Sequence, residues 1–105
     1  MGIKILWTDF AKKELQNNFN YLKVNAGLTI ARNEIRKIVK ETSRLKKQPE
    51  IGQQEDLLAD RKQGFRYIVH QSYKIIYWMN EDKNQIEIID VFNTRQNPIN
   101  INRSE

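Results

Sequence analysis

The chain has 105 residues, the usual size of a single domain and enough to bury a hydrophobic core. It has no cysteine and one histidine, His70, which excludes disulfides and makes a zinc site of thiolates and imidazoles improbable. Eighteen Lys and Arg against thirteen Asp and Glu give a net charge of +5, which suits a polyanionic or acidic partner but is also common without one.

The apolar runs are short. Residues 3–7 are too few for the apolar region of a signal peptide, and no stretch approaches the roughly 20 apolar residues of a membrane-spanning helix. We therefore expect a soluble cytoplasmic protein without a membrane partner, a metal ion or a cofactor.

The first part of the chain predicts a strand and a helix. Residues 3–7 alternate weakly and include β-branched side chains, which predicts a short first strand. Thr8 is the expected N-cap of the helix, because its hydroxyl can accept a hydrogen bond from a free backbone N–H group. Gly27 is expected to end that helix. The apolar stripe of the helix comprises Ala11, Leu15, Phe19 and Leu22, with Phe10 and Tyr21 widening it.

A second helix is predicted to begin at Thr29, as N-cap, and to be stopped by Pro49. Its apolar stripe comprises Ala31, Ile35, Ile38, Val39, Thr42 and Leu45. Its other side is basic, since residues 30–47 contain seven basic and two acidic side chains. Part of this charge is expected in the last turn, where it favours the helix dipole: Arg44, Lys46 and Lys47. The short connection at Gly27 predicts an antiparallel helical hairpin.

Three aromatic and β-branched runs follow, at residues 65–70, 73–79 and 86–92. The connections near residues 71–72 and 80–84 are short, which predicts a three-stranded antiparallel β-meander with a central strand covered on both faces. Residues 49–64 are expected to form a loop with one helical turn near residues 56–60. The predicted class is therefore α+β: a short N-terminal strand, a two-helix hairpin and a β-meander, in one domain over residues 1–98 with a polar tail at 99–105.

Several short segments, in this order along the chain, resemble one known family: WTDFA at residues 7–11, LKKQPEIG at 45–52, FRYIV at 65–69, YKIIY at 73–77 and IDVFNTRQNP at 89–98. Together they resemble the RelE/ParE toxin superfamily, the toxin half of type II toxin–antitoxin modules, over nearly the whole chain. The resemblance implies growth inhibition, a role in plasmid stabilisation and neutralisation by a cognate antitoxin. We expect the basic side of the second helix to bind that antitoxin through Arg36, Lys40 and Arg44.

The resemblance leaves two target classes open. RelE-like toxins are metal-independent mRNA endonucleases (mRNA interferases) that act on the ribosome, and their pattern maps here onto Arg66, Lys74 and Arg95 as candidate catalytic cations. ParE-like toxins inhibit DNA gyrase by binding, and for them the candidate target- or anion-binding residues are Arg66, Lys74, Arg95 and His70. The RNase pattern is incomplete, because Ile68 stands where RelE-like members carry a second Lys and no Tyr follows Arg95.

The length of the first β-hairpin loop decides whether Arg66 and Lys74 lie on the same face of the sheet. A two-residue loop at Gln71 and Ser72 would place Arg66 and Lys74 on opposite faces of the sheet, and a loop one residue longer would place them on the same face. Gln-Ser is a poor sequence for a tight turn, so the longer loop is predicted. His70 carries an imidazole, the side chain most often used as a general base, but it is expected to be exposed beside the turn.

Each candidate also has a purely structural interpretation. Arg66 and Lys74 can be solvated residues at the sheet edge, and Asp90 can be a buried partner of Arg95. The aromatic side chains are expected to pack in the core rather than stack on bases: Tyr73, Tyr77, Trp78 and Phe92. The incomplete RNase pattern and the ParE-like ending favour the ParE-like prediction over the nuclease, and a degenerate member without toxicity is a third possibility.

Overall fold

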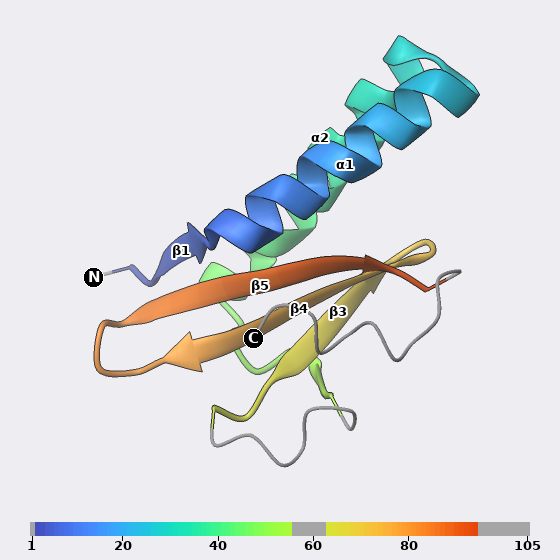
Figure 1. Cartoon of the computed structure of the whole chain (residues 1–105). Helices are drawn as coiled ribbons and strands as arrows, with labels where there is room; N and C mark the ends of the chain where they lie inside the picture. Colours follow the sequence, from blue (N-terminus) through green and yellow to red (C-terminus); the bar gives the residue numbers. More distant parts are fainter. Residues whose placement is uncertain (1, 56–62, 95–105) are drawn as a thin grey trace.

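In the computed structural model, which describes residues 2–55 and 63–94, the elements follow the predicted order (Figure 1). They are β1 (Lys4–Trp7), α1 (Asp9–Ala26), α2 (Leu28–Ser43), the 3₁₀ turn η1 (Arg44–Lys46), β2 (Gln53–Gln54), β3 (Arg66–His70), β4 (Tyr73–Asn80) and β5 (Gln85–Asn93). The α+β class with a strand, a helical hairpin and a β-meander is confirmed. The helical turn predicted near residues 56–60 and the tail at 99–105 lie outside the described residues.

The strands form one sheet in the order β1-β5-β4-β3-β2. The meander β3-β4-β5 is antiparallel, as predicted. Two pairings were not predicted: β1 runs parallel to β5, and the two-residue β2 pairs with β3. Figure 1 shows both helices on one side of the sheet, with the far end of the hairpin extending beyond it.

The sheet has an apolar layer on each face. The larger layer joins the helices to the sheet and consists of Ala11, Ile38, Leu45, Tyr73, Ile75, Tyr77, Ile86, Ile88 and Val91. The smaller layer, on the other face, consists of Phe65, Ile76 and Phe92, with Tyr67, Trp78 and Ile89 beside it. The register between β4 and β5 shifts after Ile76, where the pairing skips Ile89. The central strand β4 is therefore covered on both faces, which confirms the prediction from its composition, and the aromatic side chains pack as predicted.

The two helices share one connecting residue. Gly27 has a φ of 99°, and its N–H donates to the Lys23 carbonyl at the end of α1. Its own carbonyl accepts from the Ala31 N–H, so the same glycine is also the N-cap of α2. Helix α2 consequently begins at Leu28, and the prediction that Thr29 caps it is wrong.

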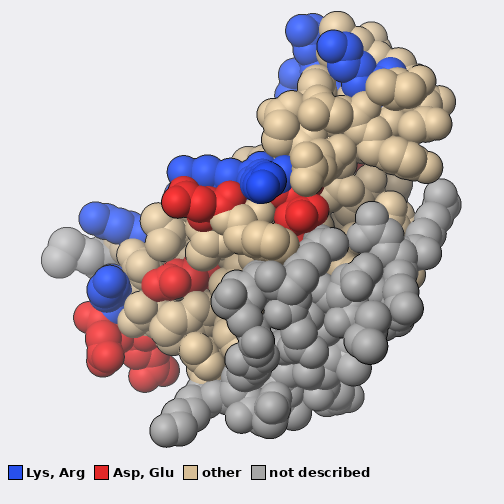
Figure 2. Space-filling model, in the orientation of Figure 1, with Lys and Arg blue, Asp and Glu red and all other residues tan. Residues whose placement is uncertain are grey.

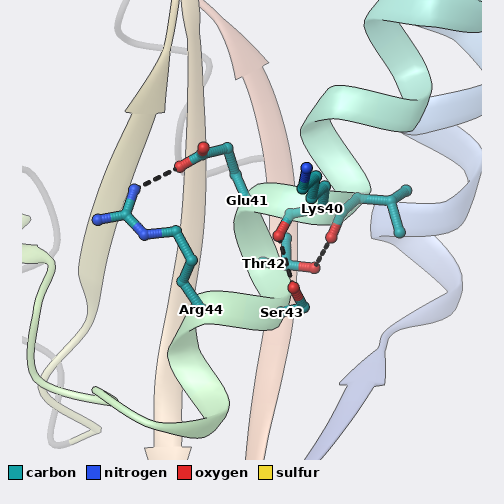
Figure 3. Close-up of polar contacts among 6 residues, drawn as sticks. Lys40, Glu41, Thr42, Ser43 and Arg44 are labelled. Atoms are coloured by element: carbon teal, nitrogen blue, oxygen red, sulfur yellow. Dashed lines mark hydrogen bonds and ion pairs between the residues drawn. The ribbon is translucent and has the colours of Figure 1, made fainter.

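Helix α2 ends earlier than predicted. Figure 3 shows the Thr42 hydroxyl donating to the Val39 carbonyl at 2.6 Å and the Ser43 hydroxyl donating to the Lys40 carbonyl at 2.7 Å. These side chains compete for carbonyls that the next helical turn would use, which favours a tighter ending. The chain continues as η1 rather than as α-helix up to Pro49, so Arg44 and Lys46 lie in a 3₁₀ turn and Lys47 follows it.

Thr8 fixes the start of α1 on the sheet, as the sequence predicted for a cap. Its Oγ1 accepts from the Ala11 N–H at 3.2 Å and donates to the Ile88 carbonyl of β5 at 2.9 Å. We expect Thr8→Ala to lower the free energy of unfolding by about 1–2 kcal/mol, because both hydrogen bonds are lost. Urea denaturation measures this difference.

Thr29→Ala is the matched control for that measurement. Thr29 is exposed inside the first turn of α2 and does not cap it, so its replacement should change stability by less than about 0.5 kcal/mol. Equal losses in the two variants would contradict the assignment of the caps.

Candidate functional site

The turn between β3 and β4 has two residues, so the prediction of a longer loop is wrong. His70 pairs with Tyr73, and Gln71 takes a positive φ of 53° that lets the chain reverse over Gln71 and Ser72 alone. In this register Arg66 lies opposite Tyr77, whose side chain is in the helix-side layer. Lys74 lies opposite Phe92, which belongs to the other layer. Arg66 and Lys74 therefore point to opposite faces of the sheet.

Arg66 helps to hold the segment before β2 against the sheet. Its Nη1 donates to the Gly52 carbonyl at 2.9 Å. The neighbouring Tyr77 hydroxyl donates to the Pro49 carbonyl at 2.8 Å and accepts from the Gly52 N–H at 2.9 Å. Tyr77 is fully buried, so it joins the centre of the sheet to this segment. Arg66 is thus partly engaged within the protein.

The buried Tyr77 gives the protein a specific alkaline pH dependence. Burial raises the pKa of Tyr77 above its usual value of 10.0, although the hydrogen bond from Gly52 and the charge of Arg66 act in the opposite direction. A raised pKa means that the unfolded chain loses this proton first. The stability that Tyr77 contributes is therefore present below pH 10 and is lost as pH rises through the folded-state pKa.

Tyr77→Phe tests this dependence. At pH 8 the variant should be less stable than the wild type by about 1–3 kcal/mol, because the Gly52 N–H and the Pro49 carbonyl each lose the Tyr77 hydroxyl. Above pH 10 the difference between the two proteins should shrink, as measured by urea denaturation at both pH values. A stability difference between the two proteins that does not change with pH would contradict the link between Tyr77 ionisation and folding.

Lys74 is held on the other face. Its Nζ lies 3.2 Å from Glu55 Oε2 and 4.2 Å from the centre of the Tyr67 ring. The Glu55 side chain is only 3% exposed, and its backbone N–H donates to the Phe65 carbonyl beside β3. Lys74 thus neutralises a buried carboxylate and packs on an aromatic face, which is a structural arrangement.

His70 joins the sheet to α2. Its Nε2 lies 3.2 Å from Glu34 Oε2, and both side chains are 15% exposed. Lys37 lies 3.8 Å from the same carboxylate on the helix surface. The expectation that His70 would be exposed beside the turn is wrong, because α2 covers this end of β3.

The predicted cations do not converge within the described part of the chain. Arg66 and His70 share a face, Lys74 is on the other, and Arg95 lies outside the described residues. Asp90, its suggested partner, is fully buried in β5. Residues 2–55 and 63–94 also contain no group of three or more His, Asp or Glu placed to hold a metal ion, and none of their helices has the length and apolar character to cross a membrane.

The predicted antitoxin contacts lie on two different sides of this helical segment, Arg36 and Lys40 on α2 and Arg44 in η1 directly after it. Arg44 donates to Glu41 Oε2 at 2.7 Å, and Figure 3 shows this pair on the side of α2 that faces β3. In the same view the Lys40 side chain extends toward the viewer, whereas Glu41 and Arg44 extend sideways. At about 100° per residue, Arg36 and Lys40 share the second side of the helix, and both are exposed.

An apolar groove runs between the two helices next to that basic side. It has a volume of about 450 Å³ and is lined by Trp7, Lys12, Leu15, Gln16, Phe19, Ile35 and Val39. The sequence placed Leu15, Phe19, Ile35 and Val39 in the apolar stripes of the two helices. They are only partly covered, and Val39 is 42% exposed. Periodicity identified the apolar residues, but it did not show that part of the stripes forms an open groove.

The comparisons agree with this geometry. The family model for the ParE toxin of the type II toxin–antitoxin system parDE matches residues 5–98. Among solved structures, the chain is similar to one from the chromosomal ParDE toxin–antitoxin system of P. aeruginosa, with a TM-score of 0.72 and 15% identity over 87% of this chain and 95% of that one. None of the curated proteins gives a significant match.

The matched residues 5–98 make up most of the chain. The chain belongs to the ParE toxin family of type II toxin–antitoxin systems.

Proposed function

We propose that this protein is a toxin that arrests growth by binding DNA gyrase and that a cognate antitoxin neutralises it. The observation that carries the proposal is the placement of Arg66 and Lys74 on opposite faces of the sheet, each with an intramolecular partner. RNA cleavage needs a base, an acid and cations around one phosphate. Side chains on opposite faces do not provide that arrangement, whereas inhibition by binding does not require it.

The groove between α1 and α2 is the proposed binding site of the antitoxin. Trp7, Leu15 and Phe19 offer an apolar surface, and Lys12 lies at its rim. Arg36 and Lys40 follow the groove along α2. An amphipathic helix with acidic residues beside its apolar face fits both features. Arg44 remains a proposed contact on the neighbouring side of α2.

Val39→Glu tests this binding site, because it adds a charge to the groove at a residue that is already 42% exposed. We expect roughly a tenfold or greater loss of antitoxin affinity, since an apolar contact is replaced by a charge that repels an acidic helix. Val24→Glu is the matched control, because Val24 is an exposed valine in the last turn of α1 and does not line the groove. Equal affinity of the Val39 variant and the wild type would place the antitoxin elsewhere.

Induction in cells without the antitoxin distinguishes the target classes. DNA damage and altered plasmid supercoiling with intact mRNA are expected for a gyrase inhibitor. Codon-phased mRNA cleavage within minutes of induction would instead establish the RelE-like alternative with Arg66, Lys74 and Arg95. Unimpaired growth would identify a degenerate member.

A further inference from the structure

The far end of the helical hairpin exposes apolar side chains that the fold does not use. We define the hairpin tip as residues 21–32, which include the last turn of α1 and the first turn of α2. Four of its five large apolar residues have exposed fractions of 41% to 84%: Tyr21 61%, Val24 84%, Leu28 41% and Ile30 51%. Tyr21 was predicted to widen the buried stripe of α1, and the structure places it in solvent. Within the tip, Ala31 is fully buried and Leu22 is partly buried.

The position of the tip explains this exposure. Figure 1 shows that the hairpin extends past the sheet, so the sheet does not cover its last turns. Folding gains little from apolar side chains at such a site, and clustered exposed apolar residues commonly mark an interaction surface. The tip is therefore a candidate for contact with another molecule.

The charge of the tip restricts the kind of partner. Residues 21–32 contain Lys23 and Arg32 and no acidic residue, a net charge of +2. Figure 2 shows Lys and Arg side chains, but no Asp or Glu, over this end of the molecule. A second copy of the tip would bring like charges together, whereas an apolar surface with an acidic rim would complement it.

The tip is also separate from the groove proposed for the antitoxin. The groove residue of α1 nearest to the tip, Phe19, lies five residues before Val24, or roughly 7.5 Å along the helix at 1.5 Å per residue. The predicted target contacts Arg66, His70 and Lys74 are each engaged inside the protein. The hairpin tip combines basic charge with exposed apolar side chains.

We infer that the hairpin tip is the target-binding surface of this toxin and that it docks on an apolar, acid-rimmed patch of the target protein. Tyr21 and Val24 provide the apolar contact, and Lys23 and Arg32 meet the acidic rim. This inference rests on the proposed function, in which the toxin acts by binding a protein. It assigns the target to the hairpin tip and the antitoxin to the neighbouring groove of the same hairpin.

The double variant Tyr21→Gln/Val24→Gln tests the inference without adding charge. In a gyrase supercoiling assay with purified proteins, we expect half-inhibition to need a concentration of the double variant at least roughly tenfold higher than that of the wild type. The reason is that a few central contacts dominate most interfaces. Arg32→Gln should produce a smaller loss that becomes weaker at high salt. Val69→Gln, an exposed valine away from the tip, is the control and should inhibit like the wild type.

The antitoxin and the cell supply the remaining comparisons. The double variant should keep its circular dichroism spectrum and its antitoxin affinity, which shows that the fold and the groove are intact. Inhibition by the double variant at the wild-type concentration would overturn the inference, and so would a parallel loss of antitoxin binding. Cosedimentation of wild type, but not variant, with vesicles containing phosphatidylserine would overturn it in favour of a membrane surface.

Growth arrest on induction separates this inference from the gyrase assignment. If the wild type arrests growth without inhibiting gyrase, the gyrase assignment fails. Growth arrest by the wild type and by the double variant then tests whether the tip binds the target. Loss of arrest in the double variant supports this role of the tip, and unchanged arrest overturns it.

Discussion

Replacing Gly52 by alanine is expected to destabilise the protein by about 3 kcal/mol or more, because the site has no room for a Cβ atom. That atom would lie 2.5 Å from the Tyr77 hydroxyl oxygen and 2.7 Å from the Tyr67 carbonyl oxygen. Neither neighbour can move freely. Tyr77 is buried and hydrogen-bonded to Pro49 and Gly52, and Tyr67 is paired in the sheet with Gln53. The segment before β2 would have to leave the sheet.

Thermal and urea denaturation measure this effect. For a domain of this size the loss corresponds to a fall in Tm of roughly 12–24 °C. Gly2→Ala is the matched control, since nothing lies within 4 Å of the Cβ position at Gly2. A Gly52 variant as stable as the Gly2 variant would contradict the close approach of this segment to Tyr77.

Replacing Lys74 by alanine is expected to lower the free energy of unfolding by about 2–3 kcal/mol, because it removes the cation beside a buried carboxylate. Glu55 stays buried in the variant, but it loses the Lys74 ammonium group that lies 3.2 Å from its carboxylate. The contact of that ammonium group with the Tyr67 ring is lost as well. Lys74 is itself 24% exposed, which limits the cost. Lys46→Ala removes an exposed lysine and should have almost no effect in the same denaturation experiment.

The Lys74 variants also separate a structural role from a catalytic one. Lys74→Arg keeps the positive charge and should recover most of the lost stability. If Lys74 is structural, the folded fraction of Lys74→Ala should inhibit growth as strongly as the wild type does. A stable Lys74→Ala protein with no toxicity would reverse the assignment and restore Lys74 as a functional residue.

The elements that depend on local chemistry could be predicted from the sequence. Thr8 caps α1 because a hydroxyl at that position serves the free N–H groups, and Gly27 ends α1 because it tolerates a positive φ. The β-branched and aromatic runs predicted β3, β4 and β5. The family resemblance, which the family model confirms, came from the same short segments.

The features that depend on long-range pairing could not be predicted from the sequence. The reversal over Gln71 and Ser72 requires a positive φ at Gln71, which turn preferences do not favour, and it moved Lys74 to the opposite face from Arg66. The Lys74–Glu55 and His70–Glu34 pairs join residues 19 and 36 positions apart. Local patterns contain no information on such contacts, so the sequence could not predict the partners of these cations.

The helical stripes show a second limit of periodicity. It identified Ala31 and Ile38 as core residues, and both are fully buried. It treated Tyr21 and Val39 in the same way, although Val39 borders the groove and Tyr21 lies on the tip. The difference depends on how far the hairpin extends past the sheet, which is a property of the assembled fold.

The supercoiling reaction of purified DNA gyrase, with and without the toxin, tests the central claim most directly. We predict inhibition of supercoiling by the wild type, reversal of that inhibition by the co-expressed antitoxin, and no toxin-dependent cleavage of mRNA on ribosomes under matched conditions. Undisturbed gyrase together with cleaved mRNA would contradict the claim that this protein acts by binding rather than by cutting RNA.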